Sequence, residues 1–74
     1  MDFARKVLNL YRELLDLIDY ARSKGYSNYD FYEKLLLALD ELSMTISRMR
    51  ARGLLDPKTE KEFEKIILET SYIS

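Results

Sequence analysis

The chain contains no cysteine and no histidine among its 74 residues. Without cysteine it has no disulfide and no thiol nucleophile, and the usual zinc ligands are missing altogether. The absence of histidine also removes imidazole acid–base catalysis. Small folds often depend on disulfides, metals or oligomerisation. With disulfides and the usual zinc sites excluded, we expect this one to rely on the packing of its own elements and on self-association.

Catalytic motifs are also missing. No Gly-rich phosphate loop occurs, and no nucleophile stands in a recognisable pattern with a base. Glu13, Asp16 and Asp19 share a helix face, but di-iron helical bundles require a Glu-x-x-His motif. We therefore expect a protein that is not an enzyme, with no cofactor, no metal site and no small-molecule substrate.

Long hydrophobic runs are absent as well. The longest uninterrupted apolar run is Leu35 to Leu39, far short of the roughly 20 residues that a membrane span needs. Charges interrupt the first residues at every turn, which is unlike a signal peptide. We expect a cytoplasmic chain that does not cross a membrane. Glutamine is absent and 34% of the residues are charged, a composition that suits a thermophilic source.

Two glycines and one proline divide the chain into three predicted helices. Gly25 and Gly53 are typical helix stops, whereas Asp56-Pro57 is a typical helix start. Ser27 or Asn28 is the expected N-cap of the second helix. The predicted helices cover residues of about 2–24, 28–52 and 57–72 in a single domain, 1–74. The short connections favour an up-down-up arrangement.

Heptad-like seams predict which sides of the helices meet. In the first helix the seam is formed by Phe3, Val7, Leu10, Leu14, Leu17 and Ala21, and in the second by Tyr32, Leu35, Leu39, Leu42, Ile46 and Met49. Two matching seams on helices of similar length indicate a long antiparallel hairpin. Apolar residues cover about half of the circumference of the first helix, so it needs a second neighbour. The third helix has a shorter apolar stripe of Phe63, Ile66, Ile67, Thr70 and Ile73. The predicted fold is all-α, a three-helix bundle that two copies could extend into a larger helical bundle.

Some apolar residues have no use in such a bundle. Leu37, Met44 and Ala51 lie seven residues apart on the otherwise polar side of the second helix, and Leu68 and Tyr72 lie opposite the stripe of the third. Isolated exposed apolar residues are ordinary, but a line of them with a charged rim is typical of a protein interface. Aromatic residues concentrate around the first connection, where they close one end of the bundle or anchor a partner. We expect a protein-protein interaction module, either a homodimer or a small accessory subunit of a larger complex.

A cluster of basic residues supports an alternative. Arg48, Arg50, Arg52 and Lys58 form the only local positive patch, which suits phosphate or an acidic partner. A DNA-binding regulator is thus the second hypothesis, although the net charge of −1 is unlike a nucleic-acid binder. The same arginines also complement the dipole at the end of the second helix. Arg50 projects near the apolar seam, where we expect it to pair with a carboxylate near the mouth of the bundle or with a carboxylate of a partner.

Overall fold

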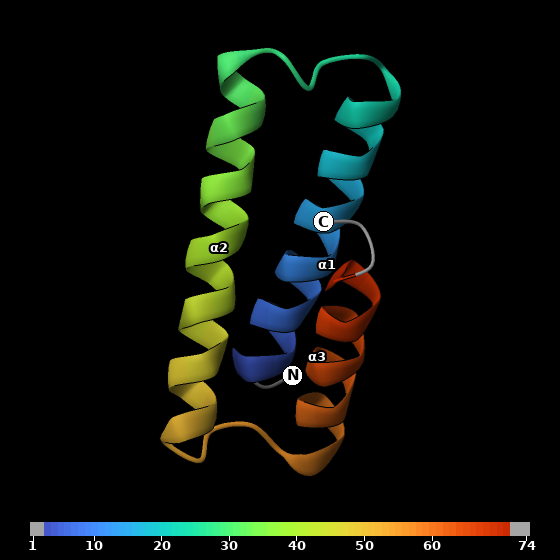
Figure 1. The fold of residues 1–74 in the computed structure, drawn as a ribbon. Coiled ribbons are helices and arrows are strands. Elements are labelled where there is room, and N and C mark those ends of the chain that lie inside the picture. The colour runs from blue at the N-terminus through green and yellow to red at the C-terminus, as the bar shows by residue number, and fades with distance from the viewer. Residues whose placement is uncertain (1–2, 72–74) are drawn as a thin grey trace.

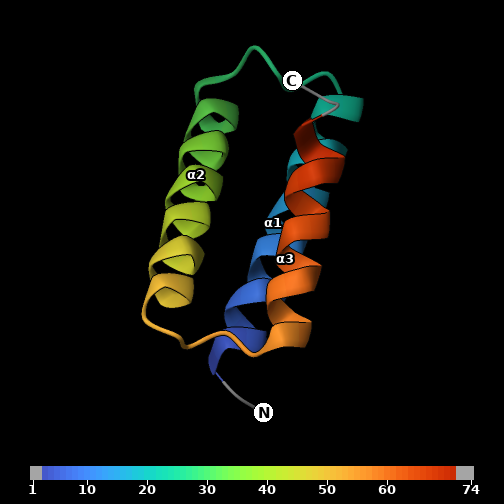
Figure 2. The ribbon, with the colours of Figure 1, turned by 60° about the horizontal axis from the view of Figure 1, so that its bottom comes forward.

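Three helices form the described part of the chain. The computed structural model describes the backbone of residues 3–71 and the side chains of residues 3–69. The helices are α1 (Phe3–Ser23), α2 (Asp30–Ala51) and α3 (Pro57–Ser71), and residues 3–71 contain no strand. α1 and α2 form an antiparallel hairpin, and α3 returns alongside α1 in the same direction as α1 (Figure 1). A second view again places α3 alongside α1 (Figure 2). The prediction of an all-α three-helix bundle is confirmed.

Glycine ends the first two helices, as predicted. Gly25 has φ 81° and Gly53 has φ 73°, a left-handed conformation that residues with a Cβ rarely adopt. Directly after Gly53, the Leu54 N–H donates to the Met49 carbonyl at 2.9 Å, and the bonds that follow α1 have the same pattern. This is the Schellman arrangement, which satisfies carbonyls at a helix end.

The start of α2 differs from the prediction. Neither Ser27 nor Asn28 caps the helix; the N-cap position is Tyr29, and its side chain makes no capping hydrogen bond. The Tyr29 N–H instead donates to the Tyr26 carbonyl at 3.1 Å, so residues 26–29 form a turn before α2 begins at Asp30. This turn takes up the expected cap residues, and an acidic residue in the first helical turn complements the dipole.

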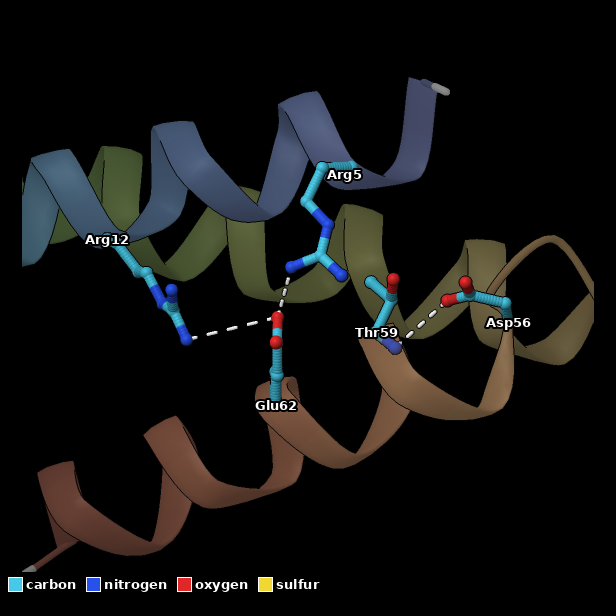
Figure 3. A network of polar contacts seen from close by, with 5 residues as sticks. All are labelled: Arg5, Arg12, Asp56, Thr59 and Glu62. Atoms are coloured by element: carbon cyan, nitrogen blue, oxygen red, sulfur yellow. Dashed lines mark hydrogen bonds and ion pairs between the residues drawn. The ribbon is translucent and has the colours of Figure 1, made fainter. Parts of the chain in front are cut away.

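The start of α3 confirms the prediction. Asp56 precedes the helix, and its Oδ1 accepts a hydrogen bond of 2.9 Å from the Thr59 N–H (Figure 3). Because the first N–H groups of a helix lack intrahelical partners, this bond satisfies one of them. Pro57 follows as the first helical residue, where its missing N–H has no cost.

The core is divided between the two ends of the hairpin. At one end, buried side chains come from all three helices: Leu8, Tyr11, Ile46, Phe63 and Ile66. At the other end the described buried residues come from α1 and α2 only: Ile18, Ala21 and Tyr32. α1 therefore contacts both neighbours, as the width of its apolar surface predicted.

The predicted seam is confirmed for α2 and wrong for part of α1. All six predicted positions of α2 are buried or half-buried, but Phe3, Leu10 and Leu17 of α1 are exposed. Ala4 and Leu8 are buried in their place. The reason is that α1 packs against two helices, so its buried arc turns toward α3 and away from the seam expected for a hairpin alone.

Candidate interaction surfaces

The predicted apolar line on α2 is solvent-exposed. Leu37 and Met44 have exposed fractions of 58% and 49%, and Ala51 is also exposed. We call these three residues the outer α2 line. Charged side chains border it, as expected, and a shallow hollow of about 240 Å³ is lined by Glu41, Met44, Thr45 and Arg48. An apolar floor with charges of both signs at its edge has the composition of a small protein contact surface.

Leu68, the one of the two predicted α3 residues whose side chain the structure describes, does not extend this line. Leu68 has an exposed fraction of 65%, but it belongs to a helix that packs against α1 more than against α2. Tyr72 lies outside the described residues, as do the side chains of Thr70 and Ile73. The structure therefore brings Leu37, Met44 and Ala51 together and leaves Leu68 on a separate surface.

A second apolar line was missed by the sequence interpretation. Phe3, Leu10 and Leu17 lie seven residues apart along α1, with exposed fractions of 69%, 52% and 49%. We call these residues the α1 stripe. The sequence pattern assigned them to the seam with α2, because periodicity alone does not say how far α3 turns the buried arc of α1. The one signal in the sequence was the width of the apolar half of this helix, which is broader than contact with α2 alone requires.

The basic cluster is partly used inside the bundle. The Arg50 Nε lies 3.0 Å from Glu60 Oε1, and its Nη2 lies 3.8 Å from Glu64 Oε1. This confirms that Arg50 pairs with carboxylates near the seam. Arg48, Arg52 and Lys58 are exposed. Because the positive charge of Arg50 is already paired with two carboxylates, the patch attracts a phosphate anion less strongly than it would with Arg50 unpaired.

Three aromatic rings pack together at the first connection. The rings of Tyr29 and Phe31 are stacked with centroids 5.1 Å apart, and Tyr26 packs edge-on against both at 5.8 Å. All three are exposed. Tyr32, in contrast, is buried, and the Arg22 Nε donates to its hydroxyl at 3.1 Å. Only Tyr32 thus closes the end of the core, whereas the other rings pack on one another outside it.

Polar contacts fix α3 against α1. Figure 3 shows Arg5 and Arg12 reaching from α1 toward Glu62 of α3. The Arg5 guanidinium donates to Glu62, and the Arg12 Nη2 lies 3.9 Å from the same carboxylate. Beyond this contact a groove of about 450 Å³ opens between the two helices, lined by Arg12, Leu15, Asp16, Asp19, Lys65, Ile66 and Glu69. Its mixture of charges favours no single sign of ligand.

Tyr11 joins the packing of α1 to a polar contact on α2. Burial raises its pKa, a hydrogen bond with the Ser43 side chain opposes this, and the negative charge of Asp40 raises it further. The ring also packs edge-on against Phe63, with centroids 5.8 Å apart. Tyr11 therefore contacts both neighbouring helices.

Residues 3–71 contain neither a cluster of metal-ligating side chains nor a membrane-spanning helix. No group of three acidic side chains converges there as a metal site would require. No helix in this part of the chain combines the length and the apolar character needed to cross a bilayer. Comparison of the chain with protein-family models, with curated proteins and with solved structures finds no match. Any functional conclusion therefore depends on the surfaces just described.

Proposed function

We propose that this chain is a non-catalytic protein-protein interaction module, which self-associates or docks as a small accessory subunit on a larger complex. The observation that carries the proposal is the exposure of large apolar side chains in regular lines on α1 and on α2. A single exposed leucine is ordinary, but lines of apolar residues bordered by charges mark contact surfaces.

The outer α2 line supports the proposal through its surroundings. Glu41 and Arg48 border Met44, so the apolar centre has a polar rim carrying both charges. Such a rim gives orientation and specificity, while the apolar centre supplies the free energy of binding. In the monomer, Leu37 and Met44 contribute little to folding because about half of each side chain already contacts water.

Sedimentation equilibrium of the wild-type chain and of Leu37→Glu/Met44→Glu tests this proposal. We expect the wild-type chain to form dimers; a double variant that is monomeric with unchanged helicity in circular dichroism would place the interface on the outer α2 line. Dimers that persist in the double variant would remove the outer α2 line as the interface. A monomeric wild-type chain would contradict self-association, and the accessory-subunit form would then require a partner that binds the wild-type chain and not the double variant.

A nucleic-acid regulator is the weaker alternative. Arg48 and Arg52 remain exposed, but Arg50 is paired with Glu60 and Glu64, and the chain as a whole is not basic. This alternative predicts salt-sensitive binding to random duplex DNA that Arg48→Glu/Arg52→Glu removes. Fluorescence anisotropy of labelled duplex at two salt concentrations separates it from the protein-interaction proposal.

A further inference from the structure

The α1 stripe lies on the open side of the hairpin. Arg5 and Arg12 pair with Glu62, which fixes the flank of α1 that faces α3. At about 100° per residue, Leu10 projects roughly 150° away from these arginines. The stripe therefore points away from α3, and its three side chains are exposed.

The neighbouring surface of α2 leaves the stripe uncovered. Arg50 marks the flank of α2 that faces α3, because it pairs with Glu60 and Glu64. The opposite flank carries Ala38 and Thr45, both exposed and both small. Small side chains at these positions do not reach over the leucines of α1, so the open side of the hairpin has an apolar edge on α1 that a partner can contact.

Charges beside the α1 stripe say which partner fits it. Lys6 and Glu13 are exposed and flank Leu10 on the side away from α2, one before it and one after it. At a rise of about 1.5 Å per residue, the lysine lies about 6 Å from Leu10 along the axis and the glutamate about 4.5 Å. A second α1 running antiparallel across Leu10 therefore places its Glu13 near Lys6, and its Lys6 near Glu13. The flank is complementary to itself in charge, which is what a two-fold interface requires.

We propose that the open side of the hairpin binds a second copy of this chain, with the two α1 helices antiparallel and Leu10 at the two-fold axis. Phe3 of one copy then lies opposite Leu17 of the other, because both are seven residues from Leu10. The inference rests on the proposed self-association, and it assigns the interface to the α1 stripe instead of the outer α2 line.

The size of the molecule agrees with such a dimer. The principal extents are 38 × 20 × 20 Å. The α1 stripe runs from residue 3 to residue 17, about 21 Å at 1.5 Å per residue, so it extends along more than half of this long side. The hydrophobic centre and the charged flank both lie on this long side.

The charges also exclude the other way of stacking two hairpins. Arg22 of α1 hydrogen-bonds the Tyr32 hydroxyl of α2, so in the antiparallel hairpin Lys6 lies about level with Arg48, and Glu13 about level with Glu41. If α1 of one copy packed on α2 of the other about an axis parallel to the helices, these level residues would approach one another. Lysine would then face arginine and glutamate would face glutamate, which is repulsive. Pairing α1 with α1 avoids both repulsions.

Charge reversal at Glu13 should change the dimer affinity in opposite directions for the two arrangements. In the proposed dimer, Glu13→Lys replaces two attractive pairs by lysine–lysine pairs, and we expect the dissociation constant to rise about tenfold. The double variant Lys6→Glu/Glu13→Lys exchanges the two charges and restores wild-type association. In the alternative stacking, Glu13→Lys would face Glu41 and strengthen association. A stronger dimer in Glu13→Lys therefore overturns the proposal.

Leu10→Glu and Leu37→Glu form a matched pair for the apolar centre. The two leucines have similar exposed fractions, 52% and 58%, so neither substitution disturbs the core. Sedimentation equilibrium should show at least about a 100-fold weaker dimer for Leu10→Glu, because two carboxylates would meet at the axis, and no change for Leu37→Glu. Dimers that survive Leu10→Glu and are lost in Leu37→Glu/Met44→Glu would overturn this inference and support the interface of the proposed function. A monomeric wild-type chain would overturn the dimer itself, in which case binding of a different protein is what the proposed function still predicts.

Discussion

Phe63 is the side chain that joins α3 to the hairpin. It is 1% exposed and lies in the cluster to which all three helices contribute, with its ring edge-on to Tyr11. Truncation of a buried phenylalanine removes apolar contact and leaves a cavity, at a cost of about 3–5 kcal/mol. A domain of this size has a free energy of unfolding of about 4–11 kcal/mol.

Phe63→Ala should therefore remove a large part of the free energy of unfolding. Urea denaturation followed by circular dichroism measures the loss. Leu37→Ala is the matched control, because an exposed position should change stability by less than about 0.5 kcal/mol. Equal losses in the two variants would show that α3 does not contribute to the core as described.

Asp56 links stability to acidity. Its pKa is lowered from the ordinary value of 3.8 by the Thr59 hydroxyl first and by the Thr59 backbone N–H second. A carboxylate whose pKa is lower in the folded state adds stability above its unfolded pKa, and that contribution is lost as the pH falls from about 3.8 through the folded pKa. We expect melting temperatures to fall in this pH range.

Asp56→Asn isolates this effect, because asparagine keeps the capping oxygen but does not titrate. The difference in melting temperature between the wild-type chain and the variant should narrow as the pH is lowered from 6 to 3. A difference that stays constant over this range would mean that another acidic residue controls the transition.

At the scale of the elements, the two glycines limit the lengths of α1 and α2. An added Cβ would meet no heavy atom within 4 Å at either Gly25 or Gly53, so space is not what excludes a side chain. The positive φ is the reason, and it costs about 1–2 kcal/mol for an L residue.

Gly53→Ala should lower the free energy of unfolding by about 1 kcal/mol in urea denaturation. The loss is smaller than the full cost of the positive φ because alanine also restricts the unfolded chain. Gly53→Asn should cost less, because asparagine tolerates this conformation; an alanine variant as stable as wild type would refute the assignment.

Helix ends were predictable where a single residue determines the backbone. Gly25, Gly53 and Pro57 have local conformational preferences that no distant contact needs to supply, and the observed ends follow them. The start of α2 was not predictable, because Ser27 and Asn28 are good caps by composition while the turn is closed by Tyr26 and Tyr29. At this point the local preference for an N-cap residue competed with the packing of the aromatic rings of the first connection, and that packing depends on how the chain folds back after α1.

At the scale of the molecule, the exposed line on α2 was predictable and the one on α1 was not. Leu37 and Met44 lie on the polar side of an otherwise amphipathic helix, so periodicity alone places them outside. Leu10 belongs to an apolar half-circle, and only the position of α3 decides which part of it is buried. The direction from which a third helix arrives depends on contacts such as Arg5–Glu62, which are far apart in the sequence.

The division of the core predicts how stability varies along α1. Leu8 and Ile18 are comparable probes, since both are almost fully buried and each lies five residues from an end of the helix. Leu8 packs in the cluster that includes α3, whereas the described partners of Ile18 come from α1 and α2. A region with fewer buried partners opens at a lower free energy, so its amides exchange faster. Native-state hydrogen exchange, corrected for intrinsic rates, should show at least about tenfold faster exchange for the Ile18 amide than for the Leu8 amide. In the Phe63→Leu variant the exchange rates of the two amides should approach each other, because the substitution removes packing at the end of the hairpin that α3 covers. Equal exchange rates in the wild-type chain would mean that the hairpin opens as one cooperative unit.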